Sequence, residues 1–241
     1  MSTPEAADAT PTGTAGHARH IKIAPSILSA DFTCLGAQIA EAEAAGADLI
    51  HVDVMDGCFV PNITIGPLVV SAARRATSLP LDVHLMIAHP EDYVDVFARA
   101  GADIITVHVE AAVHLHRLLQ AIHKAGKRAG VSLNPATPLC TVEEIVPYAD
   151  TIMVMTVNPG FGGQEFIPTM LDKIARLRAL LERRQVQCAI EVDGGVGPNT
   201  VGRVAAAGAD ILVAGAAVFA APEGIAQAIG NLRRLAEAGN E

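Results

Sequence analysis

The sequence AGADLIHVDVMD, residues 45–56, joins a helix-ending glycine to an apolar run that is typical of a buried strand. Its first four letters return at residues 100–103 and 207–210, each time directly before another apolar run, and YAD at residues 148–150 repeats the pattern without the glycine. This repetition indicates a chain built from one helix-and-strand unit used several times.

Apolar runs rich in β-branched residues recur with helix-period segments between them. We expect strands at Ile21–Ile27, Leu49–Met55, Leu81–Ile87, Ile104–Val109, Arg128–Asn134, Thr151–Val157, Cys188–Asp193 and Ile211–Gly215. Their starts lie 23 to 37 residues apart, which is the spacing of one strand and one helix. A helix expected at Pro168–Arg184 carries an apolar stripe with Lys173 mostly away from it.

Strands that are apolar at nearly every position suit a parallel sheet buried on both faces. Eight of them predict a single (β/α)8 barrel, a TIM barrel, over residues 21–241. A doubly wound open sheet is the alternative, but the turn after the first strand, PSIL at residues 25–28, is not rich in glycine. Residues 1–20 lack periodicity and an apolar stretch, so we expect a disordered tail there.

The composition excludes several classes of function. The 241 residues carry a formal charge of -9 and only 3% aromatic residues, which argues against nucleic-acid binding. The longest charge-free apolar stretch, Ile211–Pro222, is shorter than the roughly 18 residues of a membrane span, so no membrane insertion is expected. The cysteines (Cys34, Cys58, Cys140 and Cys188) are widely spaced, and we expect reduced, buried, Ala-sized residues of a cytoplasmic protein.

Polar side chains gather at the carboxyl ends of the predicted strands, where a barrel of this kind carries its active site. His51 and Asp53 are two apart and therefore point to one side, and His84 lies at the matching depth of the next strand. Asp193 can approach them from the opposite wall. This set predicts one divalent metal ion (Zn²⁺, Fe²⁺, Mn²⁺ or Co²⁺), although either histidine alone would be read as a satisfied core residue.

A second polar pair, His108 and Glu110, closes the fourth predicted strand. Because no further ligand candidate follows nearby, we expect this pair to support the metal ligands from behind or to cap a helix. His123 falls on a predicted helix and is expected to be solvated.

Glycine-rich turns follow the last three predicted strands. They contain Gly160, Phe161, Gly162 and Gly163 after the sixth, Gly194 and Gly195 after the seventh, and Gly215 and Ala216 after the eighth. Backbone N–H groups in such turns bind phosphate, and the final loops of this fold are its usual phosphate site. The alternative, that each glycine only permits a tight turn, weakens when three neighbouring loops share the feature.

Three methionines, Met55, Met86 and Met155, also lie at strand ends. They are either ordinary core residues or an apolar cap that excludes water from the polar cluster.

From Ile23 to about Phe219 the chain resembles the ribulose-phosphate 3-epimerase family. The matching stretches are APSILSADF (residues 24–32), HVDVMDGCFVPN (51–62), DVHLM (82–86), MTVNPGFGGQ (155–164) and VDGG (192–195). Their length and order make a chance match improbable. The family usually has Gly-Ser where this chain has Gly215-Ala216, so we expect weaker phosphate binding here.

The resemblance implies a metal-dependent epimerase of the pentose phosphate pathway. Such an enzyme interconverts D-ribulose 5-phosphate and D-xylulose 5-phosphate by proton transfer at C3 through a metal-stabilised enediolate. Asp53 and Asp193 would be the acid–base pair and, with His51 and His84, the metal ligands. Substrate contacts are expected from Ser26, His84, the three methionines and the glycine-rich turns. A homo-oligomer, a dimer or a hexamer, is also implied.

Two alternatives remain open. A related phosphosugar barrel could be a decarboxylase or could epimerise a six-carbon ketose phosphate. A decarboxylase should place a lysine near the carboxylates, whereas Lys22, Lys124, Lys127 and Lys173 fall at strand starts or on helices. A catalytically silent phosphosugar-binding barrel would not need a carboxylate on each face of the substrate.

Overall fold

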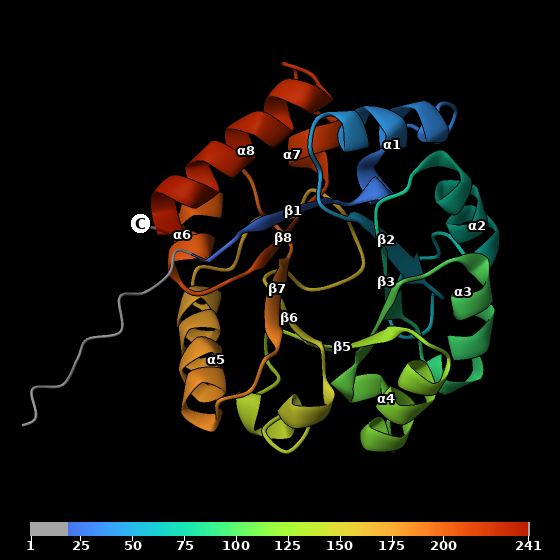
Figure 1. The fold of residues 1–241 in the computed structure, drawn as a ribbon, viewed down its shortest axis with the longest axis vertical. Coiled ribbons are helices and arrows are strands. Elements are labelled where there is room, and N and C mark those ends of the chain that lie inside the picture. The colour runs from blue at the N-terminus through green and yellow to red at the C-terminus, as the bar shows by residue number, and fades with distance from the viewer. Residues whose placement is uncertain (1–18, 241) are drawn as a thin grey trace, which may run out of the picture.

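Eight parallel strands form one closed sheet in the computed structural model, which describes residues 19–240 (Figure 1). The strands are β1 (Lys22–Pro25), β2 (Ile50–Met55), β3 (Leu81–Met86), β4 (Ile104–His108), β5 (Arg128–Leu133), β6 (Thr151–Met155), β7 (Ala189–Asp193) and β8 (Ile211–Ala214). The sheet runs in the order β1-β8-β7-β6-β5-β4-β3-β2, and a parallel bridge between Ser26 and His51 joins its two ends. The predicted (β/α)8 barrel is confirmed.

Helices surround the strands (Figure 1). They are α1 (Leu35–Ala44), α2 (Pro67–Ala76), α3 (Val94–Ala100), α4 (Leu115–Lys124), α5 (Met170–Arg184), α6 (Val201–Ala206), α7 (Ala216–Phe219) and α8 (Ile225–Asn240). Short 3₁₀ turns add η1 (Ile27–Ser29), η2 (Pro90–Asp92), η3 (Val109–Ala111), η4 (Leu139–Thr141) and η5 (Val146–Tyr148). Between β5 and β6 the chain forms η4 and η5 in place of a long helix.

The predicted strands agree with the structure to within two residues at each end. The first strand is shortened because the Ser26 hydroxyl accepts the Leu28 N–H and starts η1. This turn carries the chain away from β1 and leaves Ser26 at the mouth of the barrel.

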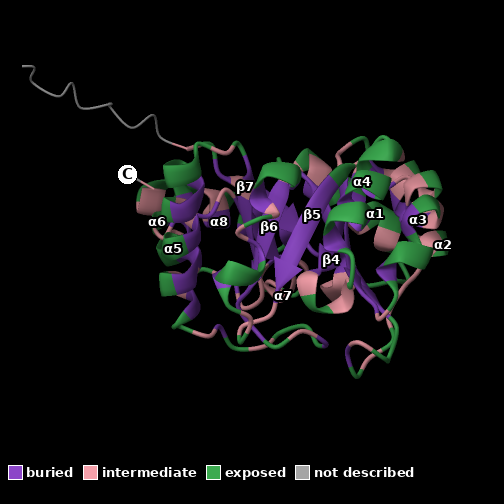
Figure 2. Ribbon diagram, turned by 90° about the horizontal axis from the view of Figure 1, so that it is seen from below, coloured by how far each residue is buried: buried purple, intermediate pink, exposed green. Residues whose placement is uncertain are grey.

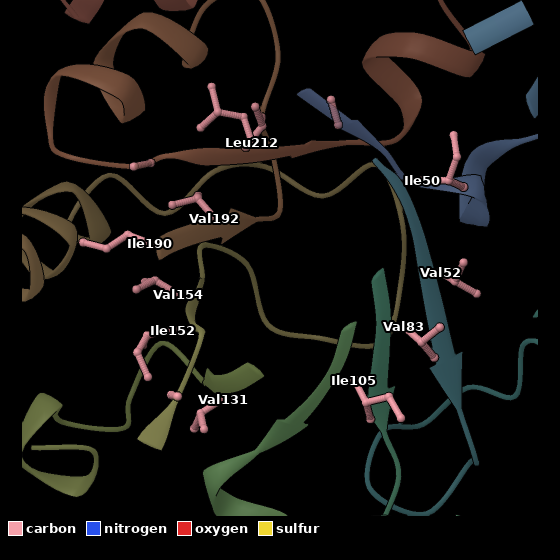
Figure 3. Packing of buried hydrophobic residues seen from close by; sticks show 14 of the residues in the cluster. Ile50, Val52, Val83, Ile105, Val131, Ile152, Val154, Ile190, Val192 and Leu212 are labelled. Carbon is pink, nitrogen blue, oxygen red and sulfur yellow. The ribbon is translucent and has the colours of Figure 1, made fainter. Parts of the chain in front are cut away.

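Alternate strand residues face the helices and form the main hydrophobic core. Figure 3 shows 14 of these side chains and labels ten, among them Ile50 on β2 and Leu212 on β8. The strands are buried almost throughout except for Arg128 at the start of β5, and most exposed residues lie on the helices and loops (Figure 2). The other strand residues, among them His51 and Asp53, therefore point into the barrel.

The aspartate of the repeated AGAD signature, and that of YAD, have a structural role at the amino-terminal end of the barrel. Each one accepts a backbone N–H from the preceding strand: Asp48 from Ile23, Asp103 from Leu81, Asp150 from Ala129 and Asp210 from Ile190. Each also contacts a basic side chain, which is Arg233, Arg74, His123 and Arg178 respectively. His123, expected to be solvated, is half exposed and lies 2.8 Å from the Asp150 carboxylate.

Lys173 differs from its expected place on the outer face of α5. Its side chain is buried, and its ammonium donates to the carbonyl groups of Asn134, Pro135 and Thr137 at 2.8 to 3.0 Å. A long lysine stem can bury its methylene groups while its charge reaches distant acceptors, which a helical pattern does not reveal.

The expectation of buried cysteines is wrong for three of the four. Cys34, Cys58 and Cys140 are exposed because they lie in loops or at the starts of helical segments, outside the packed layers. Cys188 is buried, and burial raises the pKa of its thiol to about 12.

Most of the predicted tail, residues 1–18, lies outside the described residues. Arg19 also belongs to the predicted tail, but it is bound to the barrel. Its guanidinium donates to the carbonyls of Ala205 and Ala209 and to the Asn240 side chain. Among the residues that the structure describes, no helix is long and apolar enough to cross a membrane.

Candidate active site

Four side chains meet at the carboxyl ends of β2, β3 and β7. His51, Asp53, His84 and Asp193 each offer one ligand atom, and these atoms all lie within 4.8 Å of one another. Asp53 pairs with His84 in the register of β2 and β3, so the two are neighbours across the strands. The structure thus brings together the four residues predicted as ligands, including Asp193 from the opposite wall.

Asp53 lies at the centre of this cluster. Its Oδ1 is 3.3 Å from His51 Nε2 and 3.2 Å from His84 Nδ1, while Asp193 Oδ2 is 3.8 Å from the same His84 nitrogen. Its other oxygen, Oδ2, accepts a 2.5 Å hydrogen bond from the Ser26 hydroxyl. Ser26 therefore fixes the orientation of the Asp53 carboxylate.

The donor set fits a divalent metal ion. His51 Nε2 is fully buried and has no hydrogen-bond partner, although the other ring nitrogen lies 2.7 Å from Asp82. Leaving a buried polar atom unpaired costs about 1–3 kcal/mol, and a cation bound to it would remove that cost. Two imidazole nitrogens and two carboxylates at this spacing are a common transition-metal environment.

The two aspartates differ in proton affinity. Burial opposes ionisation of Asp53, but His51 and His84 overcome it and hold the pKa of this carboxyl well below its usual range. At Asp193 burial and the charge of Asp53 outweigh the opposing effect of His51 and raise the pKa to about 7. In the absence of metal, one carboxylate is therefore ionised and the other holds a proton near neutral pH.

A deeper polar layer was not predicted. Asp82 and Glu191 point into the barrel two residues before His84 and Asp193 on their strands, Asp82 level with His51 in the register, and both are fully buried. Burial and the charge of Asp82 raise the pKa of Glu191 well above its usual value, so Glu191 is held neutral. The spacing of two that singled out His51 and Asp53 also relates Asp82 to His84 and Glu191 to Asp193, and it could have found both.

Asp82 acts on His51, its register partner on the neighbouring strand. Burial alone would lower the pKa of His51, but the neighbouring Asp53 and Asp82 carboxylates raise it well above its usual value. The Asp82 carboxylate accepts from His51 Nδ1, which directs the other ring nitrogen toward Asp53. A carboxylate behind a metal-ligating histidine is a common arrangement that fixes the ring orientation.

His108 and Glu110 lie behind His84. The Nε2 atoms of His84 and His108 are 2.9 Å apart, and His108 Nδ1 is 3.1 Å from Glu110. Burial lowers the pKa of His108 to about 4, despite the neighbouring Glu110 carboxylate. The pKa of Glu110 is lowered to about 2, because hydrogen bonds from His108, Thr137 and Asn134 outweigh its partial burial. The pair supports His84 from behind and does not form a second cluster of ligands.

A cavity of about 240 Å³ opens beside Asp53 and Asp193. It is smaller than the roughly 300–1,000 Å³ of sites for drug-sized molecules, so it suits a small metabolite. Its lining includes the other predicted substrate contacts outside the cluster: Ser26, Met55, Met86, Met155, Gly160, Phe161, Gly162, Gly163, Gly194, Gly195, Gly215 and Ala216. His51 and His84 lie behind this lining, and Ser29, which was not predicted, forms part of it.

The three methionines are both buried and in contact with the cavity. Met55, Met86 and Met155 are at most 4% exposed, yet all three line the space beside the aspartates. The two interpretations of these residues are therefore compatible, since they fill the top of the barrel core and also form an apolar wall.

Gly194 and Gly195 are required by the backbone itself. Both have positive φ angles, and a Cβ atom would lie 2.5 Å from the Val157 side chain at the first and 2.6 Å from the Phe166 backbone at the second. Close packing alone thus accounts for these two glycines. Because neither residue has a side chain, the backbone itself forms the cavity wall at this point.

Comparisons with known proteins show the family to which the chain belongs. Residues 22–219 match the family described as ribulose-phosphate 3 epimerase. The ribulose-phosphate 3-epimerase of Synechocystis sp. is 58% identical over 217 residues, which cover 89% of this chain and 94% of that protein. The enzymes of the same name from Bacillus subtilis and Escherichia coli are 56% and 51% identical, each over 83% of this chain and over 92% and 90% of their own lengths.

Solved structures with much lower identity share the fold. A 3-keto-L-gulonate-6-phosphate decarboxylase from Vibrio cholerae has a TM-score of 0.70 at 16% identity, over 91% of this chain and 98% of that one. A 3-hexulose-6-phosphate synthase from Salmonella typhimurium has a TM-score of 0.67 at 18% identity, over 89% and 98%. These likenesses concern architecture alone, whereas the sequence relatives decide the family. The chain is an epimerase and belongs to the ribulose-phosphate 3-epimerase family.

Proposed function

We propose that this epimerase of the pentose phosphate pathway interconverts D-ribulose 5-phosphate and D-xylulose 5-phosphate by moving a proton at C3 between Asp53 and Asp193. The observation that carries the proposal is the placement of these two carboxyls, which come from β2 and β7 and line the same cavity. One carboxyl group is thus available to each face of a bound substrate.

Inversion at C3 requires a proton-transfer group on each face of this carbon. The hydrogen on C3 is acidic because it lies next to the C2 ketone. One carboxylate takes this proton, and the electron pair moves onto the ketone oxygen to give an enediolate. The other carboxyl group returns a proton to the opposite face of C3, which inverts the centre. Asp53 and Asp193 come from β2 and β7, so each could serve one face.

The four clustered residues would hold one divalent ion, and the ion would supply positive charge that stabilises the enediolate oxygen. Ser26 would keep Asp53 oriented through its 2.5 Å hydrogen bond. The methionine wall would exclude water and so strengthen the electrostatic interactions of the carboxylates.

The phosphate group would bind at the glycine-rich end of the cavity. No Lys or Arg lines this cavity among residues 19–240, so backbone N–H groups and hydroxyls are the available donors. The Ser29 hydroxyl lies 2.8 Å from where a Cβ of Gly215 would be and 3.5 Å from that of Gly162. Ser29 therefore stands between two of the predicted phosphate loops and could replace the hydroxyl missing at Ala216.

A decarboxylase remains the less supported function. Such an enzyme should present a lysine to the carboxylates, but Lys173 is directed to three backbone carbonyls outside the cavity. The sequence relatives also favour the epimerase, because the decarboxylase likeness rests on fold alone.

We also propose a homo-oligomer, a dimer or a hexamer. An apolar groove between α1 and α2 supports this, since it is lined by Leu35, Val69, Phe32 and Leu68, and Leu68 is 88% exposed. Light scattering coupled to size exclusion should give a mass above that of one chain, and Leu68→Glu should reduce it. A monomeric unaltered protein would contradict the proposal.

The main experiment is conversion of D-ribulose 5-phosphate to D-xylulose 5-phosphate by metal-free protein reloaded in turn with Zn²⁺, Fe²⁺, Mn²⁺ or Co²⁺. We expect activity to be lost with chelator and restored by at least one ion, in proportion to bound metal. Full activity in protein shown to be metal-free would contradict the metal site. Metal binding without conversion would favour the silent phosphosugar-binding barrel.

A further inference from the structure

The two nitrogens of His84 face different surroundings. Nδ1 points to the ligand cluster, at 3.2 Å from Asp53 Oδ1 and 3.8 Å from Asp193 Oδ2. Nε2 points away from it and lies 2.9 Å from Nε2 of His108, with the two rings inclined by only 22°. Two imidazole nitrogens at this distance must share one proton, because two lone pairs or two N–H groups would repel each other.

Glu110 decides which nitrogen carries that proton. Its Oε1 accepts the Asn134 N–H at 2.8 Å and the Thr137 hydroxyl, and its Oε2 lies 3.1 Å from His108 Nδ1. An ionised carboxylate only accepts hydrogen bonds, so His108 must carry its proton on Nδ1. His108 Nε2 is then a lone pair, and the shared proton belongs to His84 Nε2.

The arrangement is held rigidly from outside the site. Lys173 on α5 donates to the carbonyls of Asn134, Pro135 and Thr137, which belong to the loop that supplies the two donors to Glu110. Phe59 covers the other side, with its ring centroid 4.7 Å from that of His108. His108 is fully buried, so solvent does not compete for its nitrogens.

We propose that Glu110 and His108 are positioning residues that keep a proton on Nε2 of His84, so that Nδ1 is the nitrogen left to bind the divalent metal. The inference rests on the proposed metal site. Glu110 would then do for His84 what the Asp82 carboxylate does for His51. The difference is that Asp82 contacts its histidine directly, whereas Glu110 acts through the imidazole of His108.

Glu110→Gln tests the direction of the hydrogen bonds that link His84, His108 and Glu110, because glutamine has nearly the same shape as glutamate. The amide oxygen should stay with the Asn134 N–H and the Thr137 hydroxyl, which places the NH₂ group against His108 Nδ1. His108 would then carry its proton on Nε2 and donate it to His84, whose own proton would move to Nδ1. We expect Co²⁺ affinity, measured by titration followed in the visible spectrum, to fall about 10- to 100-fold.

Glu91→Gln is the matched control, because Glu91 also lies beside a histidine, His89, but on the surface and 3.9 Å away. It should leave Co²⁺ affinity unchanged. Equal affinity in the unaltered and Glu110→Gln proteins would overturn the positioning role of Glu110 and His108 but not the metal site. Failure of the unaltered protein to bind Co²⁺ would instead overturn the proposed metal site.

A second measurement does not depend on metal. In ¹⁵N-histidine-labelled, metal-free protein, NMR should find His108 protonated on Nδ1 only and His84 protonated on Nε2. In Glu110→Gln the His108 proton should move to Nε2, a change that loss of packing alone would not produce. Finding His108 protonated on Nε2 in the unaltered protein would overturn the proposal even if the variant folds poorly.

Discussion

Asp53 and Asp193 place carboxylate oxygens within 4.8 Å of each other from β2 and β7, yet their proton affinities lie on opposite sides of the usual aspartate value. The difference arises because His51 and His84 compensate for the burial of Asp53, while burial and the Asp53 charge act together on Asp193. The two carboxyls are therefore not equivalent in the metal-free protein, and each lines the cavity from its own wall of the barrel.

Replacing either aspartate should therefore stop epimerisation. Asp53→Asn and Asp193→Asn should each lower kcat about 10²- to 10⁴-fold, because one face of C3 loses its proton-transfer group. In D₂O, a variant that keeps one carboxylate should still exchange the C3 hydrogen of a single epimer without forming the other. The readouts are conversion and deuterium incorporation by mass spectrometry.

Both aspartates are also proposed ligands, so these assays need protein with measured metal content. A loaded variant that exchanges one epimer alone would separate lost proton transfer from lost metal. Full turnover by both variants would refute the two-carboxylate scheme.

Metal binding should release protons, and their number should depend on pH. Without metal, the neighbouring carboxylates keep a proton on His51, and the pKa of Asp193 is about 7. Both groups must lose their protons to act as ligands. About two protons should be released at pH 6 and about one at pH 8, where Asp193 is already ionised, so affinity should rise with pH across this window.

Calorimetric titration of Zn²⁺ in buffers with different ionisation enthalpies measures this release. Asp193→Asn has no carboxyl to titrate and should remove the difference between pH 6 and pH 8. The same proton count at both pH values in the unaltered protein would contradict the raised pKa of Asp193.

Ser29 should contribute to phosphate binding and not to proton transfer. Ser29→Ala should raise KM about 2- to 10-fold with kcat nearly unchanged, because one hydrogen bond worth about 0.5–1.5 kcal/mol is lost from both the ground state and the transition state. Inhibition by inorganic phosphate should weaken to a similar extent. Ala216→Ser is the reciprocal variant and should lower KM. A Ser29→Ala enzyme that loses kcat at constant KM would place this hydroxyl elsewhere in the reaction.

The sequence was sufficient to predict the barrel and the central cluster because both follow from local periodicity. Strands that are buried on both faces are apolar throughout, so His51 and Asp53 were conspicuous as exceptions two residues apart. The neighbouring strand then supplied His84 at the same depth, as the register of β2 and β3 confirms.

Residues whose role depends on contacts between distant elements were harder to predict. Asp82 and Glu191 precede His84 and Asp193 by two residues, so the pattern marks them as facing the barrel interior, but it does not show their contacts with His51 on another strand. Ser29 approaches Gly215 only because closure of the barrel places β1 beside β8. Lys173 was assigned to the outer face of its helix, since the helical period gives the direction of a Cβ atom but not where a long side chain ends.

The repeated aspartate of the AGAD signature should contribute to stability. Asp210 Oδ2 accepts the Ile190 N–H at 2.8 Å and also binds the Arg178 guanidinium. In Asp210→Ala the start of β7 loses this acceptor and a partly buried guanidinium loses its charged partner. We expect the free energy of unfolding to fall by about 1–3 kcal/mol, measured by urea denaturation followed by circular dichroism.

Asp172→Ala is the control, because it removes an ion pair without removing an acceptor for a strand N–H. Asp172 pairs with Arg176 one turn further along α5, but both side chains are largely exposed and Asp172 accepts no strand N–H. Water replaces such a pair readily, so the urea midpoint should move much less than in Asp210→Ala. Equal shifts in the two variants would mean that the signature aspartate acts only as a surface charge. A larger shift for Asp210 would instead show that the signature aspartate fixes the start of β7.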